Sequence, residues 1–593
     1  MKSARARGSD ERGVVLVWLA ITLVLLLGVT ALGIDVAYWQ VTKNREQRAA
    51  DAAALAGAVT FPGDLAASNT QAQGVASNNG YTVGAVNPLS GGSTCPLSGN
   101  TTICAGAGDR AYQYKVTVAQ KVNNFFGGIF GIGTTTVRAS AQAEYLGPLK
   151  MGSPSYQFGN DPDATTWPIN AASPPKTYPN FWANINGGGT AKQQGDAYAA
   201  NWCDANGGQL VTDGCSASGN GNNLNYTANG YYYAVDFTAA GSANLQVFDP
   251  AFVDVGQFCA SNGNLAGAAA LKNIPGYPEG ATNTADIAKR FAPVGNASNP
   301  ADPGFQYCTG DNIFPNSSGQ NIAPNTTYTV WKATVPGHPE SATQACAPIT
   351  YKGLNASVAT ALTNNNPVNF AKYFRQWASL CTVNGNKGDE YFIQVQTDNG
   401  GGSNHFAMRG VSGGNNGAPV TIAGNTYMGM YANVGSNQLT KFYLVRVPSA
   451  AKGHTLLLNF YDIGDANSVG SLQVVPPPDA SGNNISGGVF SGCQWTGDTT
   501  NGAQGFSVKS PTSPWGTLSP GGIPNCKVSG VNGAGTWNGQ WSTVSVPIPS
   551  NYACNDASTD GCWLTINYLF AGQVHDVTSW TAALLGDPVR LVK

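Results

Sequence analysis

Gly13 to Thr60 reads GVVLVWLAITLVLLLGVTALGIDVAYWQVTKNREQRAADAAALAGAVT, and this stretch decides how the rest of the chain is placed. Its first part, Val14 to Ile34, contains 21 residues and no charge. At about 1.5 Å of rise per residue, such a helix spans roughly the 30 Å hydrocarbon core of a bilayer. No proline or β-branched residue interrupts Lys43 to Ala58, which favours continued helix. The stretch predicts one long helix, half in lipid and half outside it.

The charges before the apolar run predict its direction in the membrane. Four basic residues lie in the short N-terminal tail: Lys2, Arg5, Arg7 and Arg12. By the positive-inside rule, residues 1–12 stay in the cytoplasm and the chain after Asp35 is exported. A cleaved signal peptide is the alternative, because Ala31-Leu32-Gly33 loosely fits a cleavage site. The run is longer than the roughly 7–15 apolar residues of a signal peptide, which favours an uncleaved anchor.

The same stretch resembles the N-terminal segment of the TadE/TadG-like proteins of the Tad (tight-adherence) pilus-assembly system. Their pattern is a basic tail, Arg-Gly, an apolar helix, an aspartate and a Gln-x-Ala-Ala-Asp-Ala-Ala-Ala-Leu-Ala-Gly-Ala tail. These elements appear here as Arg12-Gly13, Asp35 and the run from Gln47 to Ala58. Glu46 departs from the pattern, which usually has an apolar residue before the glutamine.

Trp18 is a second departure, at the position where processed type IV-like pilins carry a glutamate. The resemblance therefore implies a permanently anchored, TadG-like protein rather than a pilin that prepilin peptidase cleaves after Gly13. It also implies a single-pass protein of the bacterial cytoplasmic membrane, with most of the chain outside the cytoplasm or at the cell surface. The implied role is assembly, anchoring or adhesion of a Tad/Flp pilus, with pilus-assembly or pilin proteins as partners.

Small residues on the outer part of the helix predict a contact with a partner protein. They recur three or four positions apart, at Ala50, Ala53, Ala54 and Gly57. A face of this kind allows two backbones to approach closely. We expect it to contact other pilus components.

Composition limits the function classes that remain. The chain has 593 residues, which predicts roughly three or four domains. Charged residues make up 10% of the chain and the net charge is −2, so a nucleic-acid surface of clustered Lys and Arg is excluded. Hydrophobic residues at 42%, with abundant glycine, predict many short strands joined by turns.

The 12 cysteines all follow the apolar run, and their even number predicts disulfides rather than metal ligands. Three close pairs are the best disulfide candidates: Cys95 with Cys104, Cys203 with Cys215, and Cys554 with Cys562. Longer pairings follow only from adjacency: Cys259 with Cys308, Cys346 with Cys381, and Cys493 with Cys526. The sequence leaves this connectivity open.

Strand patterns predict a mostly β ectodomain on a single N-terminal transmembrane helix. Residues 61–148 predict a small α+β module, with alternating strands on either side of a short apolar helix or turn at Phe125 to Phe130. This module also resembles the segment that follows the anchor in TadG-like proteins.

The remaining chain predicts tandem β-sandwich or jelly-roll-like domains. We place a first β-rich domain at 149–390, a sandwich-type domain at 391–478 and a C-terminal β-rich domain at 479–593. Two hairpins end in an aromatic residue followed by aspartate, at Asp249 and at Asp462. Their repetition indicates two copies of one domain.

A polar loop after the second hairpin is the one candidate metal site. Asp462, Asp465 and Asn467 place side-chain oxygens close together on a glycine-containing loop. Oxygen ligands of this kind suit calcium. The same residue types are common turn formers after a strand, so a plain turn is the alternative. We expect no other cofactor.

No pattern in the chain predicts catalysis, so we expect a protein that is not an enzyme. Ser412 lies in a glycine-rich loop that superficially resembles that of a serine protease, and His405 is nearby, but a glycine-rich turn explains it more simply. The 13 tryptophans and 24 tyrosines could stack on sugars if they were exposed in contiguous rows. A carbohydrate-binding surface adhesin is therefore the first alternative to a pilus protein. An exported hydrolase is the second.

Overall fold

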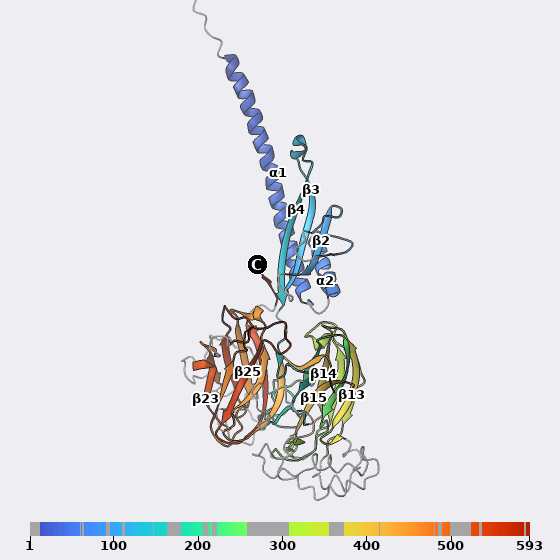
Figure 1. Ribbon diagram of the computed structural model, residues 1–593, viewed down its shortest axis with the longest axis vertical. Coiled ribbons are helices and arrows are strands. Elements are labelled where there is room, and N and C mark those ends of the chain that lie inside the picture. The colour runs from blue at the N-terminus through green and yellow to red at the C-terminus, as the bar shows by residue number, and fades with distance from the viewer. Residues whose placement is uncertain are drawn as a thin grey trace, which may run out of the picture. The chain divides into compact units, whose positions relative to one another are not determined.

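The computed structural model describes residues 12–59, 61, 65–89, 95–108, 113–145, 148–162, 180–204, 212, 214–215, 222–257, 307–354, 373–413, 416–479, 481–483, 489–497, 524–532, 537–585 and 589–592. The chain divides into two compact units (Figure 1). The first, here called the anchor unit, comprises Met1–Tyr145 and Asp587–Lys593. The second, here called the β unit, comprises Leu146–Gly586.

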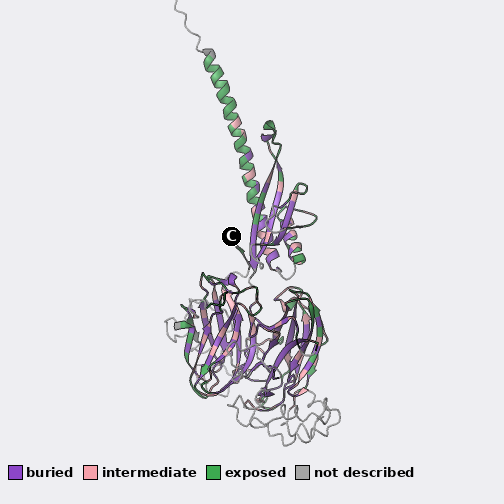
Figure 2. Ribbon diagram, viewed as in Figure 1, coloured by how far each residue is buried: buried purple, intermediate pink, exposed green. Residues whose placement is uncertain are grey.

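The anchor unit is built on one uninterrupted helix, α1 (Arg12–Ala58), of 47 residues. This confirms the long helix expected from Gly13 to Thr60. Among the described residues, α1 is the one helix long and apolar enough to cross a membrane. Nearly all side chains from Val14 to Ile34 are exposed (Figure 2), as expected for a surface that faces lipid.

A sheet and a short helix, α2 (Leu65–Asn78), pack against the outer half of α1. The sheet order is β1-β2-β3-β4-β27. Its strands are β1 (Asn87–Pro88), β2 (Thr101–Ala107), β3 (Gln113–Asn123), β4 (Thr134–Tyr145) and β27 (Val589–Val592). β27 comes from the far end of the chain and pairs antiparallel with β4. Residues that we assigned to the C-terminal domain thus complete the α+β module.

The β unit contains strands β5 to β26, joined by turns and short 3-10 helices. Its first strands are β5 (Lys150–Met151), β6 (Gln157–Phe158), β7 (Asn180–Asn186), β8 (Tyr231–Phe237), β9 (Gly241–Phe248), β10 (Thr326–Lys332), β11 (Thr343–Gln344), β12 (Ile349–Tyr351), β13 (Trp377–Gly385), β14 (Glu390–Thr397) and β15 (Ser403–Ser412). The others are β16 (Asn416–Gly417), β17 (Val420–Asn425), β18 (Tyr427–Val434), β19 (Thr440–Arg446), β20 (Thr455–Tyr461), β21 (Gly470–Val475), β22 (Gln494–Gly497), β23 (Lys527–Val531), β24 (Trp541–Pro547), β25 (Trp563–Phe570) and β26 (Val574–Leu585). In the described part of the chain, the 3-10 helices are η1 (Gly127–Phe130), η2 (Lys192–Gln194), η4 (Pro339–Ser341), η5 (Ser449–Ala451) and η7 (Pro524–Cys526).

These strands form two sheets that pack face to face as an extended sandwich. One sheet runs β10-β14-β8-β17-β5-β19-β25-β21-β23. The other runs β13-β9-β15-β7-β18-β26-β20-β24-β22. Aromatic side chains join the two sheets, as where the ring of Phe181 on β7 lies 5.4 Å from that of Phe442 on β19. The sandwich architecture predicted for the ectodomain is confirmed.

The same strand arrangement occurs twice in the β unit. β9 lies between β13 and β15, and β20 lies between β24 and β26. In the facing sheet, β14 lies between β8 and β10, and β25 lies between β19 and β21. The two strand pairs that end in aromatic-Asp, β8 with β9 and β19 with β20, therefore occupy equivalent places in two copies of one fold. Neither is the hairpin that we predicted, because β8 and β19 lie in one sheet and β9 and β20 in the other.

The strand pairings cross both boundaries that we placed inside the β unit. β14 begins at the boundary near residue 390 and pairs with β8. β25 lies beyond the boundary at 479 and pairs with β19, which lies before it. Local periodicity marks where a strand lies but not its partner across a long connection, so the sequence could not place these boundaries.

Candidate functional site

Asp35 is the first charged residue after the apolar run, and it holds the turn between β3 and β4. Its carboxylate accepts backbone N–H bonds from Phe125 at 2.7 Å, Phe126 at 3.0 Å and Gly127 at 2.6 Å. The side chain is 1% exposed. Charge-assisted bonds of this kind are about twice as strong as neutral ones. The aspartate therefore ties the base of the membrane helix to the sheet.

The small-residue face of α1 packs against its own sheet. Ala50, Ala53 and Ala54 are fully buried in a core that they share with Tyr114 and its strand neighbours. A Cβ at Gly57 would overlap the Tyr114 ring. The predicted partner contact through Ala50, Ala53, Ala54 and Gly57 is therefore wrong. The close backbone approach that small residues permit is used inside the anchor unit.

Two polar side chains next to this face also lie against the sheet. Gln47 Nε2 donates to the Ser140 carbonyl of β4 at 3.0 Å and to Asp51 Oδ1 at 2.7 Å. Glu46 is fully buried, and neither of its carboxylate oxygens has a hydrogen-bond partner among the described residues. An unsatisfied buried polar group costs about 1–3 kcal/mol, more if it is charged. Glu46 thus departs from the expected pattern at a position where an apolar residue would fit.

In the β unit, Asp249 and Asp462 perform the same structural task in the two copies. Both have positive φ, 52° and 56°, a conformation that few residues other than glycine adopt. Each aspartate makes two bonds to the segment that comes just before a neighbouring strand, β13 for Asp249 and β24 for Asp462. Its backbone N–H donates to a carbonyl of that segment, and its carboxylate accepts a backbone N–H from it. The carbonyl and N–H partners are Gln376 and Arg375 for Asp249, and Gln540 and Gly539 for Asp462. The repeated aspartate therefore fixes a turn.

A third carboxylate, Asp576 on β26, joins Asp462 and Asp465. Asp576 accepts backbone N–H bonds from Gly464 at 3.0 Å and Asp465 at 3.4 Å, and the Tyr568 hydroxyl donates to it. Burial, followed by the nearby Asp576 charge, raises the pKa of Asp465 to about 8. Burial raises the pKa of Asp576 to about 6. Asp576 was not predicted from the sequence, although a carboxylate within a strand was a visible signal.

The three predicted calcium ligands differ in their exposure to solvent. Asp462 is buried and Asp465 is partly exposed, whereas Asn467 is exposed. The carboxylates of Asp462 and Asp576 already accept backbone N–H bonds from turns. Oxygen donors alone fit a hard cation, but the raised pKa values of the carboxylates fit bound protons equally well. The bonds of Asp462 with Gly539 and Gln540 fit the alternative, in which this residue forms a turn.

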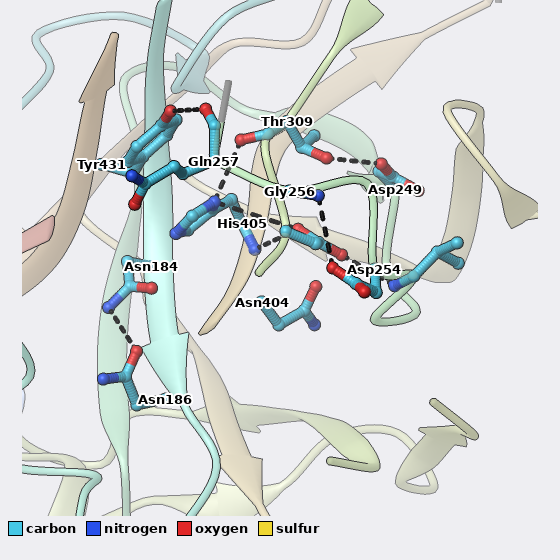
Figure 3. Close-up of polar contacts among 12 residues, drawn as sticks. Asn184, Asn186, Asp249, Asp254, Gly256, Gln257, Thr309, Asn404, His405 and Tyr431 are labelled. Atoms are coloured by element: carbon cyan, nitrogen blue, oxygen red, sulfur yellow. Dashed lines mark hydrogen bonds and ion pairs between the residues drawn. The ribbon is translucent and has the colours of Figure 1, made fainter. Parts of the chain in front are cut away.

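A second polar cluster surrounds His405 on β15 (Figure 3). The buried imidazole stacks on the Tyr431 ring, with centroids 4.1 Å apart, and its Nδ1 lies 3.0 Å from the Thr309 carbonyl. Nδ1 must therefore carry the proton and donate it. Burial lowers the pKa of His405 to about 3, so the ring is neutral. Asp311 accepts backbone N–H bonds from His405 at 2.8 Å and from Val253 at 2.9 Å.

These contacts hold the segments at 249–257 and 307–312 against β15. Ser412 lies at the other end of the same strand, seven residues from His405. At about 3.3 Å per residue, the two are roughly 23 Å apart. Ser412 and His405 cannot act as a nucleophile and its base.

With this geometry in place, comparison with known proteins identifies the N-terminal stretch. Residues 13–60 match the Tad family model of Flp pilus-assembly TadE/G-like proteins. The chain carries a TadE/G-like Tad segment. No curated protein and no solved structure matches the chain. The Tad segment coincides with α1, and it supports a Tad-associated role for a protein with a single-pass membrane anchor.

Disulfides join all three close cysteine pairs that the sequence singled out: Cys95 with Cys104, Cys203 with Cys215, and Cys554 with Cys562. Cys346 with Cys381 and Cys493 with Cys526 are also joined. Cys259 lies outside the described residues, so its expected pairing with Cys308 is not described.

The disulfides also decide whether cysteine side chains can bind a metal. Among the described residues, Cys554, Asp556 and Cys562 are the one His, Cys, Asp or Glu trio whose ligand atoms all lie within 4.8 Å of one another. The disulfide leaves no thiolate there to bind a metal.

Proposed function

We propose that the chain is a TadG-type component of a Tad/Flp pilus system that holds an exported β unit at the bacterial surface. Its N-terminal tail lies in the cytoplasm, and the chain after Asp35 lies outside. It acts in pilus assembly, anchoring or adhesion without catalysis. The resemblance and the matched Tad segment support the pilus role, and the basic tail supports the orientation.

The observation that carries this proposal is the continuity of α1. One helix of 47 residues, about 70 Å long, extends the Tad segment from its apolar run into the core of the anchor unit. Asp35 fixes the sheet to this helix, so the anchor unit cannot rotate freely about a hinge at the membrane surface. A load on the unit passes through packed backbone to the lipid-facing segment. This arrangement suits an anchor.

The two alternatives lack a comparable observation. In the described part of the β unit, no Trp, Tyr or Phe is exposed, so no aromatic platform for sugars favours the adhesin alternative. The separation of Ser412 from His405 removes the suggested arrangement for a hydrolase. We therefore advance the pilus role alone.

Deletion of the gene in its host, followed by complementation, tests the proposal. We expect fewer pili by electron microscopy and weaker surface attachment, with both restored by the full chain. A matched variant in which Val14 to Ile34 is exchanged for a cleavable signal peptide should export the protein without restoring either. Wild-type piliation and attachment in the deletion strain would contradict the pilus role. An N-terminus cleaved after Gly13 would contradict a permanent anchor.

A further inference from the structure

The turn between β3 and β4 exposes a group of large apolar side chains. Four of them are more than half exposed: Phe125 (65%), Ile129 (79%), Phe130 (67%) and Ile132 (57%). No charged residue lies between Lys121 and Arg138. Figure 2 shows the exposed residues at the end of this hairpin. We call residues 125–132 the tip. The sheet does not bury these apolar side chains, so we expect another apolar surface to cover the tip.

The tip is held at a defined height along α1. The hairpin runs beside the helix with its turn toward the N-terminal end of α1 (Figure 1). Contacts confirm this direction. Tyr114, near the start of β3, lies against Gly57 at the C-terminal end of α1, whereas Asn124, just after β3, accepts a hydrogen bond from Trp39 Nε1 at 2.8 Å. The three bonds to Asp35 then fix the first residues of the tip.

The tip lies beside the end of the membrane-spanning run of α1. The uncharged residues stop at Ile34, and Asp35 is the first group that requires a polar environment. Tyr38 and Trp39 follow it, and such aromatic residues favour the boundary between lipid and water. The Tyr38 ring packs edge-on against Phe125, with centroids 5.1 Å apart. The apolar surface of the tip is therefore continuous with the lipid-facing surface of α1.

We propose that the tip inserts into the interfacial region of the bilayer beside Asp35 and forms a second membrane contact. Its occupant is the boundary between acyl chains and headgroups, which takes up exposed Phe and Ile side chains. A helix alone leaves rotation about its axis open, whereas a helix and a tip set the orientation of the anchor unit. This inference rests on the membrane anchor and does not depend on the pilus role.

Spin-label accessibility in the full chain tests the proposal. A nitroxide is attached to Ile129→Cys, and in a second protein to Phe130→Cys, with the chain reconstituted in phosphatidylcholine vesicles. Leu65→Cys on α2 is the matched control, because Leu65 is also an exposed apolar residue (46%). Its helix contacts Tyr114 through Asn69, at the Gly57 end of α1 and away from the tip. Collisions with oxygen, which concentrates in lipid, are compared with collisions with a water-soluble nickel chelate. Exposed positions tolerate such changes, so folding is preserved.

We expect the ratio of oxygen to nickel accessibility to be several-fold higher at both tip labels than at Leu65. Equal ratios at the tip and at Leu65 would place the tip in water and overturn the proposal. Protection of the tip labels from both reagents would also overturn it, because protein would then cover the tip, either a partner or a second copy. Each outcome is independent of whether the host makes pili.

Discussion

Replacing Gly57 by alanine tests whether the small-residue face of α1 serves its own unit. In an open helix, exchange of glycine for alanine stabilises by about 0.5–1 kcal/mol. Here the added methyl would overlap the Tyr114 ring, whose hydroxyl donates to Asn69 Oδ1 at 2.7 Å and resists displacement. Overpacking costs about 1–3 kcal/mol, so we expect a net loss of about 1–2 kcal/mol. The contact with Tyr114 thus turns a substitution that normally stabilises a helix into one that should lower stability.

Hydrogen–deuterium exchange of the full chain in detergent measures this loss locally. Peptides that cover β3 should exchange roughly 5- to 30-fold faster in Gly57→Ala, since about 1.4 kcal/mol corresponds to a factor of ten. Gly74→Ala on α2 is the matched control, because nothing lies within 4 Å of a Cβ there. It should leave the exchange of β3 unchanged.

A double variant identifies the contact itself. Tyr114→Leu makes room at Gly57, so Gly57→Ala should cost less in that background, with a coupling energy of about 0.5–3 kcal/mol. Unchanged or slower exchange in Gly57→Ala, combined with lost crosslinks to pilus proteins, would refute the reasoning. The face would then be a partner surface after all.

Three further predictions concern the β unit. Asp249→Ala and Asp462→Ala should each lower its stability by about 1–3 kcal/mol, because each leaves a buried backbone N–H without its acceptor; unequal effects in thermal unfolding would contradict the equivalence of the two turns. In the folded state the pKa is about 8 for Asp465 and about 6 for Asp576, above the unfolded value near 3.9. The native state therefore binds more protons than the unfolded state, and stability should fall as the pH rises from about 4 to 8. Asp465→Asn should flatten that pH profile. Chelation by EDTA should leave the thermal midpoint unchanged; a decrease that added calcium reverses would establish a calcium site at Asp462 and Asp465.

The sequence by itself determined the features that depend on local composition and spacing. A run of 21 uncharged, mostly apolar residues is long enough to cross a membrane as a helix, and the Gln47 to Ala58 pattern is specific enough to identify the Tad segment. Close cysteine spacing predicted three disulfides that the structure contains. The repeated aromatic-Asp at a strand end indicated two copies of a sandwich, because the same turn requires the same residue in each copy.

Only the tertiary structure decided what each of these features contacts. Ala53 and Gly57 have the same small side chains whether they face a partner or Tyr114, so periodicity could not choose between them. Asp576 is far from Asp462 in the chain, and only the alignment of β26 beside β20 brings their carboxylates near each other. β27 joins β4 across more than 400 residues. Partners set by long-range strand pairing leave no local trace, whereas a helix is decided by its own neighbours.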